Sequence, residues 1–247
     1  AEAAQHAQPS QPRPLREIVA LVSWRDRNLA GATQAGLVNN FNDGLVWVVL
    51  PVLLADHGLR VDEIGWIKAL YPFMWAAGMI ATGQLADRIG RKAPIVLGML
   101  TQAVGLAVIA AGLSPALAAG LAGAFLLGVG TALVYPALLA AVTDASHPSW
   151  RPSALGVYRF WRDSGYALGA LTGGITAAIA SLNAAVLLAA LITATSGIAS
   201  ATLIRRPPPQ TNETNPARGQ PPPKQRHPRP KTTEGSANVT TPTRERP

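Results

Sequence analysis

The sequence predicts an all-α membrane protein: a bundle of six transmembrane helices between disordered, cytoplasmic termini. Three observations favour this fold class. Only 14% of the 247 residues are charged, whereas soluble domains have about 25%. Residues 93–143 contain no Asp, Glu, Lys or Arg, and neither do residues 164–204. The basic residues outside these runs lie in segments that six crossings would place on one side of a membrane.

The six expected helices follow from the length of the apolar segments. A helix needs about 20 residues to cross roughly 30 Å of hydrocarbon. Each uncharged run therefore holds two crossings, with hinges at Ser114-Pro115 and near Ser181-Leu182-Asn183. One further crossing fits on each side of the polar segment ADHGLRVDEI. The expected spans are 29–54, 64–86, 94–112, 117–143, 154–180 and 184–204.

The two ends of the chain are polar. Residues 205–247 contain 11 Pro, nine Lys or Arg and three Glu, and we expect them to be disordered because they cannot bury enough apolar surface to offset the entropy of ordering. Residues 1–28 form a linker that ends in the amphipathic stretch LREIVALVSWRDR. The chain begins with Ala rather than Met, so we expect a fragment or a processed product.

The distribution of positive charge predicts the orientation. With six spans, residues 1–28, 87–93, 144–153 and 205–247 share one side, and they hold most of the basic residues. The loops of the opposite side hold only Arg60. Because Lys and Arg are in excess on the cytoplasmic face, both termini are expected in the cytoplasm, with the bundle in the plasma or inner membrane.

Small residues recur at every fourth position in two of the expected spans. This spacing lets neighbouring helices approach closely, and tight packing is the favoured interpretation. A substrate path beside these rows is the alternative. The rows are Gly120, Ala124, Gly128, Ala132, Pro136 and Ala140 in one span, and Gly165, Gly169, Gly173 and Ala177 in the other.

Composition and motifs argue against other functions. The absence of Cys excludes a thiol nucleophile and a Cys-ligated metal, and the four His residues are scattered. There is no Gly-x-Ser-x-Gly elbow and no phosphate-cradling loop. The net charge of +8 comes mostly from outside the apolar region. We therefore expect no enzyme, metal, cofactor or nucleic-acid partner.

Polar residues within the first span mark the best candidate binding site, because such residues are costly in a membrane. Asn39, Asn42 and Asp43 are spaced to share a helical face. Asp43 is expected to bind a cation or to carry a coupling proton, since burial favours the neutral form of a carboxyl group. The equally weighted alternative is an ion pair with Lys68 on the next helix.

Aromatic residues add a second group of candidates. Tyr71 and Trp75 lie four residues apart in the second span, and Tyr135 lies in the fourth. They are expected to form an amphipathic wall of the path. Packing between helices, or an aromatic belt at the membrane surface, is the alternative.

The segment GQLADRIGRKAPI at 83–95 resembles the loop signature of the major facilitator superfamily, which joins the second and third helices of each six-helix half. The resemblance implies that this loop latches the two halves of a transporter in one state, with Asp87 at the N-terminus of a facing helix. A topology anchor without a gating role is the alternative. The signature residues are Gly83, Asp87, Arg88, Gly90, Arg91 and Lys92.

Two further segments resemble the fourth and fifth helices of such a half: 128–151 and the stretch ALGVYRFWRDSGYALGALTGG. The second is similar to an antiporter motif, although Ala170 stands where that motif has Pro, so it does not establish antiport. Arg159 and Asp163 are spaced to pair, and the two arginines of this stretch would favour anionic substrates if they lined the cavity. The expected rim network comprises Asp144, Arg151, Arg159, Arg162 and Asp163.

The resemblance covers about 16–205, six helices where a complete transporter has twelve. We expect the C-terminal half of a secondary transporter, or permease, that moves a small solute by alternating access with ion or proton coupling. The N-terminal half is the second choice. Its partners would be the solute, the lipid bilayer and either the other half of the same parent chain or a second copy. A non-transporting truncated protein, or an interaction module with a partner-binding tail, is the alternative.

Overall fold

The computed structural model describes residues 13–205, and all of the regular secondary structure within them is helical. Residues 1–12 of the expected linker, and all but Arg205 of the tail 205–247 that is expected to be disordered, lie outside the described residues. The elements are α1 (Leu15–Ala20), the π-helix η1 (Leu21–Arg25), α2 (Arg27–Asp56), α3 (Val61–Ile89), α4 (Lys92–Ala110), α5 (Ala116–Ala145), α6 (Arg151–Ile179) and α7 (Leu182–Leu203).

Five of these helices, α2, α3, α4, α5 and α7, are long and apolar enough to cross a membrane. The sixth long helix, α6, has 29 residues but does not meet this criterion of composition. Its N-terminal half carries four charged residues, Arg151, Arg159, Arg162 and Asp163. The sequence therefore predicts an all-α membrane protein correctly, and length and composition identify five of the six expected crossings among residues 13–205.

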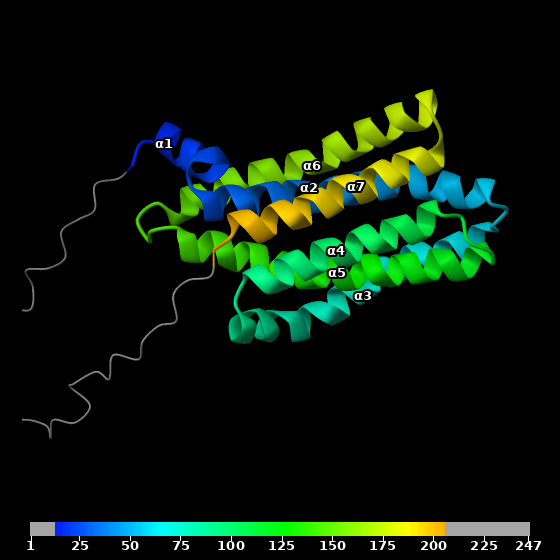
Figure 1. Ribbon diagram of the computed structural model, residues 1–247, viewed down its shortest axis with the longest axis horizontal. Coiled ribbons are helices and arrows are strands. Elements are labelled where there is room, and N and C mark those ends of the chain that lie inside the picture. Colours follow the sequence, from blue (N-terminus) through cyan, green and yellow to red (C-terminus); the bar gives the residue numbers. More distant parts are fainter. Residues whose placement is uncertain (1–12, 206–247) are drawn as a thin grey trace, which may run out of the picture. The chain divides into compact units, whose positions relative to one another are not determined.

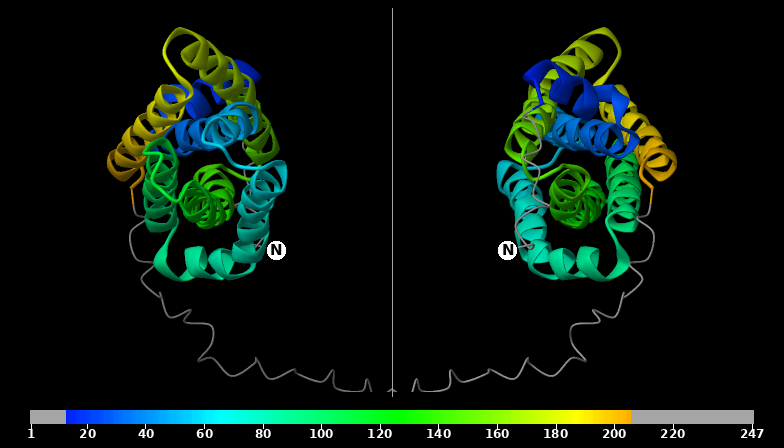
Figure 2. Two further views of the ribbon diagram at one scale, coloured as in Figure 1. Left: turned by 90° about the vertical axis from the view of Figure 1, so that its right-hand side faces the viewer. Right: turned by 90° about the vertical axis from the view of Figure 1, so that its left-hand side faces the viewer.

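The long helices form a bundle around two central members, α2 and α5 (Figure 1). Helix α5 packs against α3 and α4, and α2 packs against α6 and α7. Viewed along the bundle, α3 and α6 lie on one side of this central pair and α4 and α7 on the other (Figure 2). Within residues 13–205, α3 and α6 do not pack against each other. Direct helix contact therefore joins α4 to α7 on one side of the central pair but does not join α3 to α6 on the other.

Helix α6 lies directly on the backbone of α2 because it has glycine at the contact points. A Cβ atom at Gly165 would lie 2.2 Å from the Leu37 carbonyl oxygen, and one at Gly169 would lie 2.0 Å from that of Phe41. The row of small residues on α5 lies in the same way against α3, where a Cβ at Gly128 would be 2.6 Å from the Tyr71 carbonyl oxygen. Both rows of small residues thus serve close packing between helices, as the favoured interpretation of the sequence predicts.

The loop between α3 and α4 is shorter than the sequence suggests. Helix α3 continues to Ile89, so that only Gly90 and Arg91 separate it from α4. Gly90 has φ = 84°, a conformation that side chains disfavour. Asp87 therefore lies in the last turn of a helix.

The amphipathic stretch before the bundle folds as α1 and η1. Ile18 and Val22 are fully buried in the core that also contains α2 and α6 residues. Asp26 then caps α2 by accepting hydrogen bonds from the backbone N–H groups of Asn28 and Leu29, both at 2.9 Å. This segment is a packed part of the fold.

Candidate functional site

Asp43 is the buried acid of the bundle, with 5% of its surface exposed. It is the 17th of the 30 residues of α2 and so lies near the middle of that helix. One carboxylate oxygen accepts a hydrogen bond from the Tyr71 hydroxyl of α3, and the other lies 3.5 Å from the Tyr166 hydroxyl of α6. Helices α2, α3 and α6 thus meet at one carboxylate.

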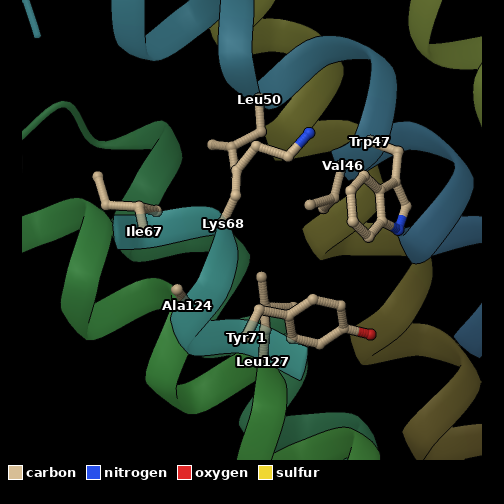
Figure 3. Close-up of a pocket in the computed structure, with 8 residues that line it drawn as sticks. All are labelled: Val46, Trp47, Leu50, Ile67, Lys68, Tyr71, Ala124 and Leu127. Atoms are coloured by element: carbon tan, nitrogen blue, oxygen red, sulfur yellow. The ribbon is translucent and has the colours of Figure 1, made fainter. Parts of the chain in front are cut away.

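Lys68 does not pair with Asp43. Its Nζ atom lies 4.3 Å from the centre of the Trp47 ring, a cation–π arrangement, and no ion pair within residues 13–205 involves Asp43. In the small pocket drawn in Figure 3, the Lys68 side chain extends toward Leu50 and Trp47, while the Tyr71 hydroxyl points away from it. The expected alternative, an Asp43–Lys68 pair, is therefore wrong.

Three aromatic rings continue from the Tyr71–Asp43 contact. Tyr71 stacks on Trp75 with ring centres 6.5 Å apart, and Trp75 lies 5.5 Å from Tyr135 of α5. The Tyr71 hydroxyl also lies 3.3 Å from Thr131 Oγ1. The Trp75 Nε1 atom is buried and has no hydrogen-bond partner among the described residues. The rings of Tyr71, Trp75 and Tyr135 thus lie in one row, and the Trp75 Nε1–H group is available as a hydrogen-bond donor.

Arg162 of α6 contacts Tyr135, the last ring of this row. It donates a hydrogen bond to the Tyr135 hydroxyl at 3.0 Å and forms an ion pair with Asp163 at 2.7 Å. Asp163 therefore pairs with its neighbour rather than with Arg159, which is exposed. Asn40 donates to the same Asp163 oxygen at 3.4 Å. The charge of Arg162 is offset, so this arginine alone does not make the site anion-selective.

A second polar network lies on the other side of α2. Asn42 donates to Gln102 Oε1 of α4 at 3.0 Å, and Gln102 donates to Asn39 Oδ1 at 2.9 Å. Thr193 of α7 donates to Asn42 Oδ1 at 2.8 Å. All four side chains are buried. This network joins α2 to α4 and α7, and none of its buried side-chain atoms lacks a hydrogen-bond partner among the described residues.

The structure thus separates residues that the sequence placed on one face. Asp43 points toward α3 and α6, whereas Asn39 and Asn42 bond to α4 and α7. Sequence reasoning gave no role to Gln102, Thr193, Thr131 and Tyr166. A signal was present for one of them, because Gln102 is the only side-chain amide in the uncharged run 93–143.

At one end of the bundle, Arg91 joins two acids. It contacts Asp87 at 2.5 Å and Asp144 at 3.0 Å. The hydrogen bond that Arg91 donates to Asp87 raises the pKa of the Arg91 guanidinium, which stays charged. The partner of Asp87 is thus the Arg91 side chain and not a helix N-terminus. Arg151, expected in the same network, donates instead to the Ser146 carbonyl oxygen at 3.3 Å. Of the other signature residues, Arg88 is exposed, and Gly83 and Lys92 are half-buried.

A bundle of apolar helices with a polar, aromatic face between two of them is typical of a polytopic membrane protein that handles a solute. Comparison with known families agrees. The sequence profile of the Major Facilitator Superfamily matches residues 34–240, and the chain belongs to this family of membrane transporters. The recognition from the loop signature is thereby confirmed.

Individual relatives include transport and resistance proteins. The methyl viologen resistance protein SmvA of Salmonella typhimurium is 35% identical over 129 residues, which are 52% of this chain and 26% of the relative. The puromycin resistance protein pur8 of Streptomyces alboniger is 30% identical over 53% of this chain and 26% of its own length. The putative niacin/nicotinamide transporter NiaP of Bacillus subtilis is 28% identical over 67% of this chain and 41% of its own length. The chain thus matches about a quarter to two fifths of these relatives.

Proposed function

We propose that this chain is the C-terminal six-helix half of a secondary transporter, and that the solute moves by alternating access between this half and a second one. The second half belongs to the same parent chain or to another copy. Helix α6 then provides the sixth crossing. Its charged residues lie at one end and along the site, which suits a helix that borders a polar cavity rather than lipid.

The observation that carries the proposal is the environment of Asp43. This carboxylate is buried in the middle of an apolar bundle and is hydrogen-bonded by tyrosines, without a basic partner among residues 13–205. A buried charge without a counter-ion is costly. Asp43 therefore takes up a proton or a cationic solute, and exchange between the two couples transport to a proton gradient.

The surrounding side chains favour a flat, aromatic cation as the solute. The rings of Tyr71, Trp75 and Tyr135 offer π faces that attract cations, and Asp43 supplies the negative charge at one end. Arg162 is neutralised by Asp163. Two of the relatives are named for resistance to methyl viologen and to puromycin, which agrees with export of organic molecules from the cell.

The contacts of Arg91 with Asp87 and Asp144 support a latch at the rim. This end of the bundle faces the cytoplasm in our proposal, because the basic residues of the expected loops lie there. The protein then resides in the plasma or inner membrane with both termini in the cytoplasm.

The test is transport by the full-length parent protein in proteoliposomes. Uptake of ethidium, a flat aromatic cation, is measured against a sugar and an organic anion of similar size, with and without a proton gradient. We expect gradient-dependent movement of the cation alone. Absence of transport for all three solutes would contradict the transporter proposal and favour the alternative of a membrane interaction module. Transport of the anion but not the cation would contradict only the solute class.

A further inference from the structure

The helical segment 15–25, formed by α1 and η1, is fixed to the end of the bundle. Its residues Ile18 and Val22 are 2% and 0% exposed. The Trp161 Nε1–H of α6 donates a hydrogen bond to Ser23 Oγ at 2.9 Å. The side chains on the outer surface of this segment therefore have defined positions, which is a requirement for a binding site.

Four arginines flank or belong to this segment, and two of them are engaged within the fold. Arg13 forms an ion pair with Glu17 at 3.0 Å and lies 5.7 Å from the Trp150 ring centre. Arg27 donates to the Thr202 carbonyl oxygen of α7 at 3.3 Å. These two arginines hold the segment in place.

The other two arginines line one open depression. Arg16 and Arg25 border it together with Pro14, Glu17 and Ala20. Neither arginine makes an ion pair or a side-chain hydrogen bond within residues 13–205. The charge of Glu17 is offset by Arg13. The depression thus presents two guanidinium groups whose charge nothing in the described chain balances, and it is suited to an anion.

The neighbouring side chains indicate which kind of anion. Trp24, next to Arg25, is 64% exposed, as is Leu15 at the start of the segment. Trp24 lies three residues before α2, a helix that is apolar enough to span a membrane. Tryptophan is enriched at the level of lipid headgroups. The exposed Trp24 indole lies beside Arg25, just before a helix that can span the membrane. This position suits the headgroup layer of a bilayer better than bulk water.

We propose that Arg16 and Arg25 bind the phosphate of an anionic phospholipid, with Trp24 inserted beside it into the interface. Guanidinium groups suit phosphate because they donate several hydrogen bonds in a fixed plane. The bound lipid anchors the segment that leads into α2. This proposal does not depend on the transported solute or on Asp43.

The test uses the full chain in a neutral detergent, titrated with phosphatidylglycerol or phosphatidylcholine. Bound lipid is counted by native mass spectrometry, and the midpoint of thermal unfolding, Tm, is followed in parallel. We expect phosphatidylglycerol to bind in preference and to raise Tm. Arg16→Gln and Arg25→Gln should each weaken its binding roughly fivefold, the value of about one basic residue at a charged lipid surface. Arg25→Lys should retain part of the affinity.

Two controls make the result decisive. Arg60→Gln removes one positive charge at the opposite end of α2, where Arg60 pairs with Asp62, and should leave phosphatidylglycerol binding unchanged. Soluble glycerol 3-phosphate should not raise Tm. Equal binding of the two lipids by the unmodified chain would overturn the proposal, whatever the variants do. An equal loss in Arg60→Gln would do the same, and stabilisation by glycerol 3-phosphate would replace the lipid with a soluble anion.

Discussion

The Tyr71 hydroxyl on α3 donates a hydrogen bond to the Asp43 carboxylate on α2, and this contact lies within the bundle rather than at its surface. The same hydroxyl is 3.3 Å from Thr131 Oγ1 on α5. Tyr166 reaches the second carboxylate oxygen from α6. A change of charge at Asp43 therefore acts on side chains from three other helices, α3, α5 and α6, and for this reason we propose Asp43 as the centre of the transport cycle.

Replacing Tyr71 by Phe tests the stronger of the two tyrosine contacts. Tyr71→Phe retains the ring that stacks on Trp75 and removes the donor to Asp43. A hydrogen bond to a charged group contributes about 1.5–3 kcal/mol, so we expect the initial rate of solute transport by the parent protein to fall about tenfold or more. Tyr166→Phe is the comparison. Its contact with Asp43 is 3.5 Å long and weak, and an equal loss in both variants would contradict this ranking.

The network behind α2 is predicted to contribute to stability. Thr193→Val keeps the shape of the side chain but removes the hydroxyl that lies 2.8 Å from Asn42 Oδ1 and 2.6 Å from the Ala189 carbonyl oxygen. A buried acceptor left unpaired costs about 1–3 kcal/mol, so Tm should fall. Thr195→Val on the same helix is the control, because Thr195 is exposed and bonds only its own backbone at Ile192. Similar Tm values for the two variants would contradict a structural role for the network.

Contact between α6 and α2 requires glycine at particular positions. At Gly169 an added Cβ would lie 2.0 Å from the Phe41 carbonyl oxygen, whereas at Gly174, on the same helix, it would meet nothing within 4 Å. Gly169→Ala is expected to destabilise the bundle by about 1–3 kcal/mol, and Gly174→Ala should leave it nearly unchanged. Thermal unfolding in detergent measures both. Equal stability of the two variants would mean that α6 does not pack on α2 as described.

The function of the rim depends on whether Arg91 acts by charge alone or by joining two acids. It reaches Asp87 through one terminal nitrogen and Asp144 through Nε, a geometry that lysine cannot reproduce. We expect Arg91→Lys to insert in the same orientation but to transport nearly as slowly as Arg91→Gln. Both should unfold at about the Tm of the unmodified chain, since exposed ion pairs contribute about 0–1 kcal/mol. Full transport activity in Arg91→Lys would favour a topology anchor.

Much of the fold could be predicted because the membrane imposes simple rules on composition. The uncharged run 93–143 has to form two helices with a hinge, and the structure has α4 and α5 there. Helix α6 was harder to judge by composition, since a helix that borders a polar face carries charges such as Arg162 and Asp163. The extension of α3 through Asp87 was missed because a charged motif after an apolar run resembles a loop.

The site was only partly predictable, because the partner of a side chain depends on how helices pack. The spacing of Asn39, Asn42 and Asp43 indicates a shared face, yet the helices around α2 take these side chains into two different networks. The contact of Tyr166 with Asp43 joins residues 123 positions apart. No local pattern contains such a contact.

The most direct test of the account concerns Asp43 itself. Full-length parent protein carrying Asp43→Asn is compared in proteoliposomes with the unmodified protein and with Asp62→Asn, which removes an exposed acid outside the site. We expect Asp43→Asn to abolish accumulation of ethidium driven by a proton gradient while exchange of labelled for unlabelled solute partly continues. Asp62→Asn should accumulate normally. Undiminished accumulation in Asp43→Asn would contradict the role of this carboxylate in coupling.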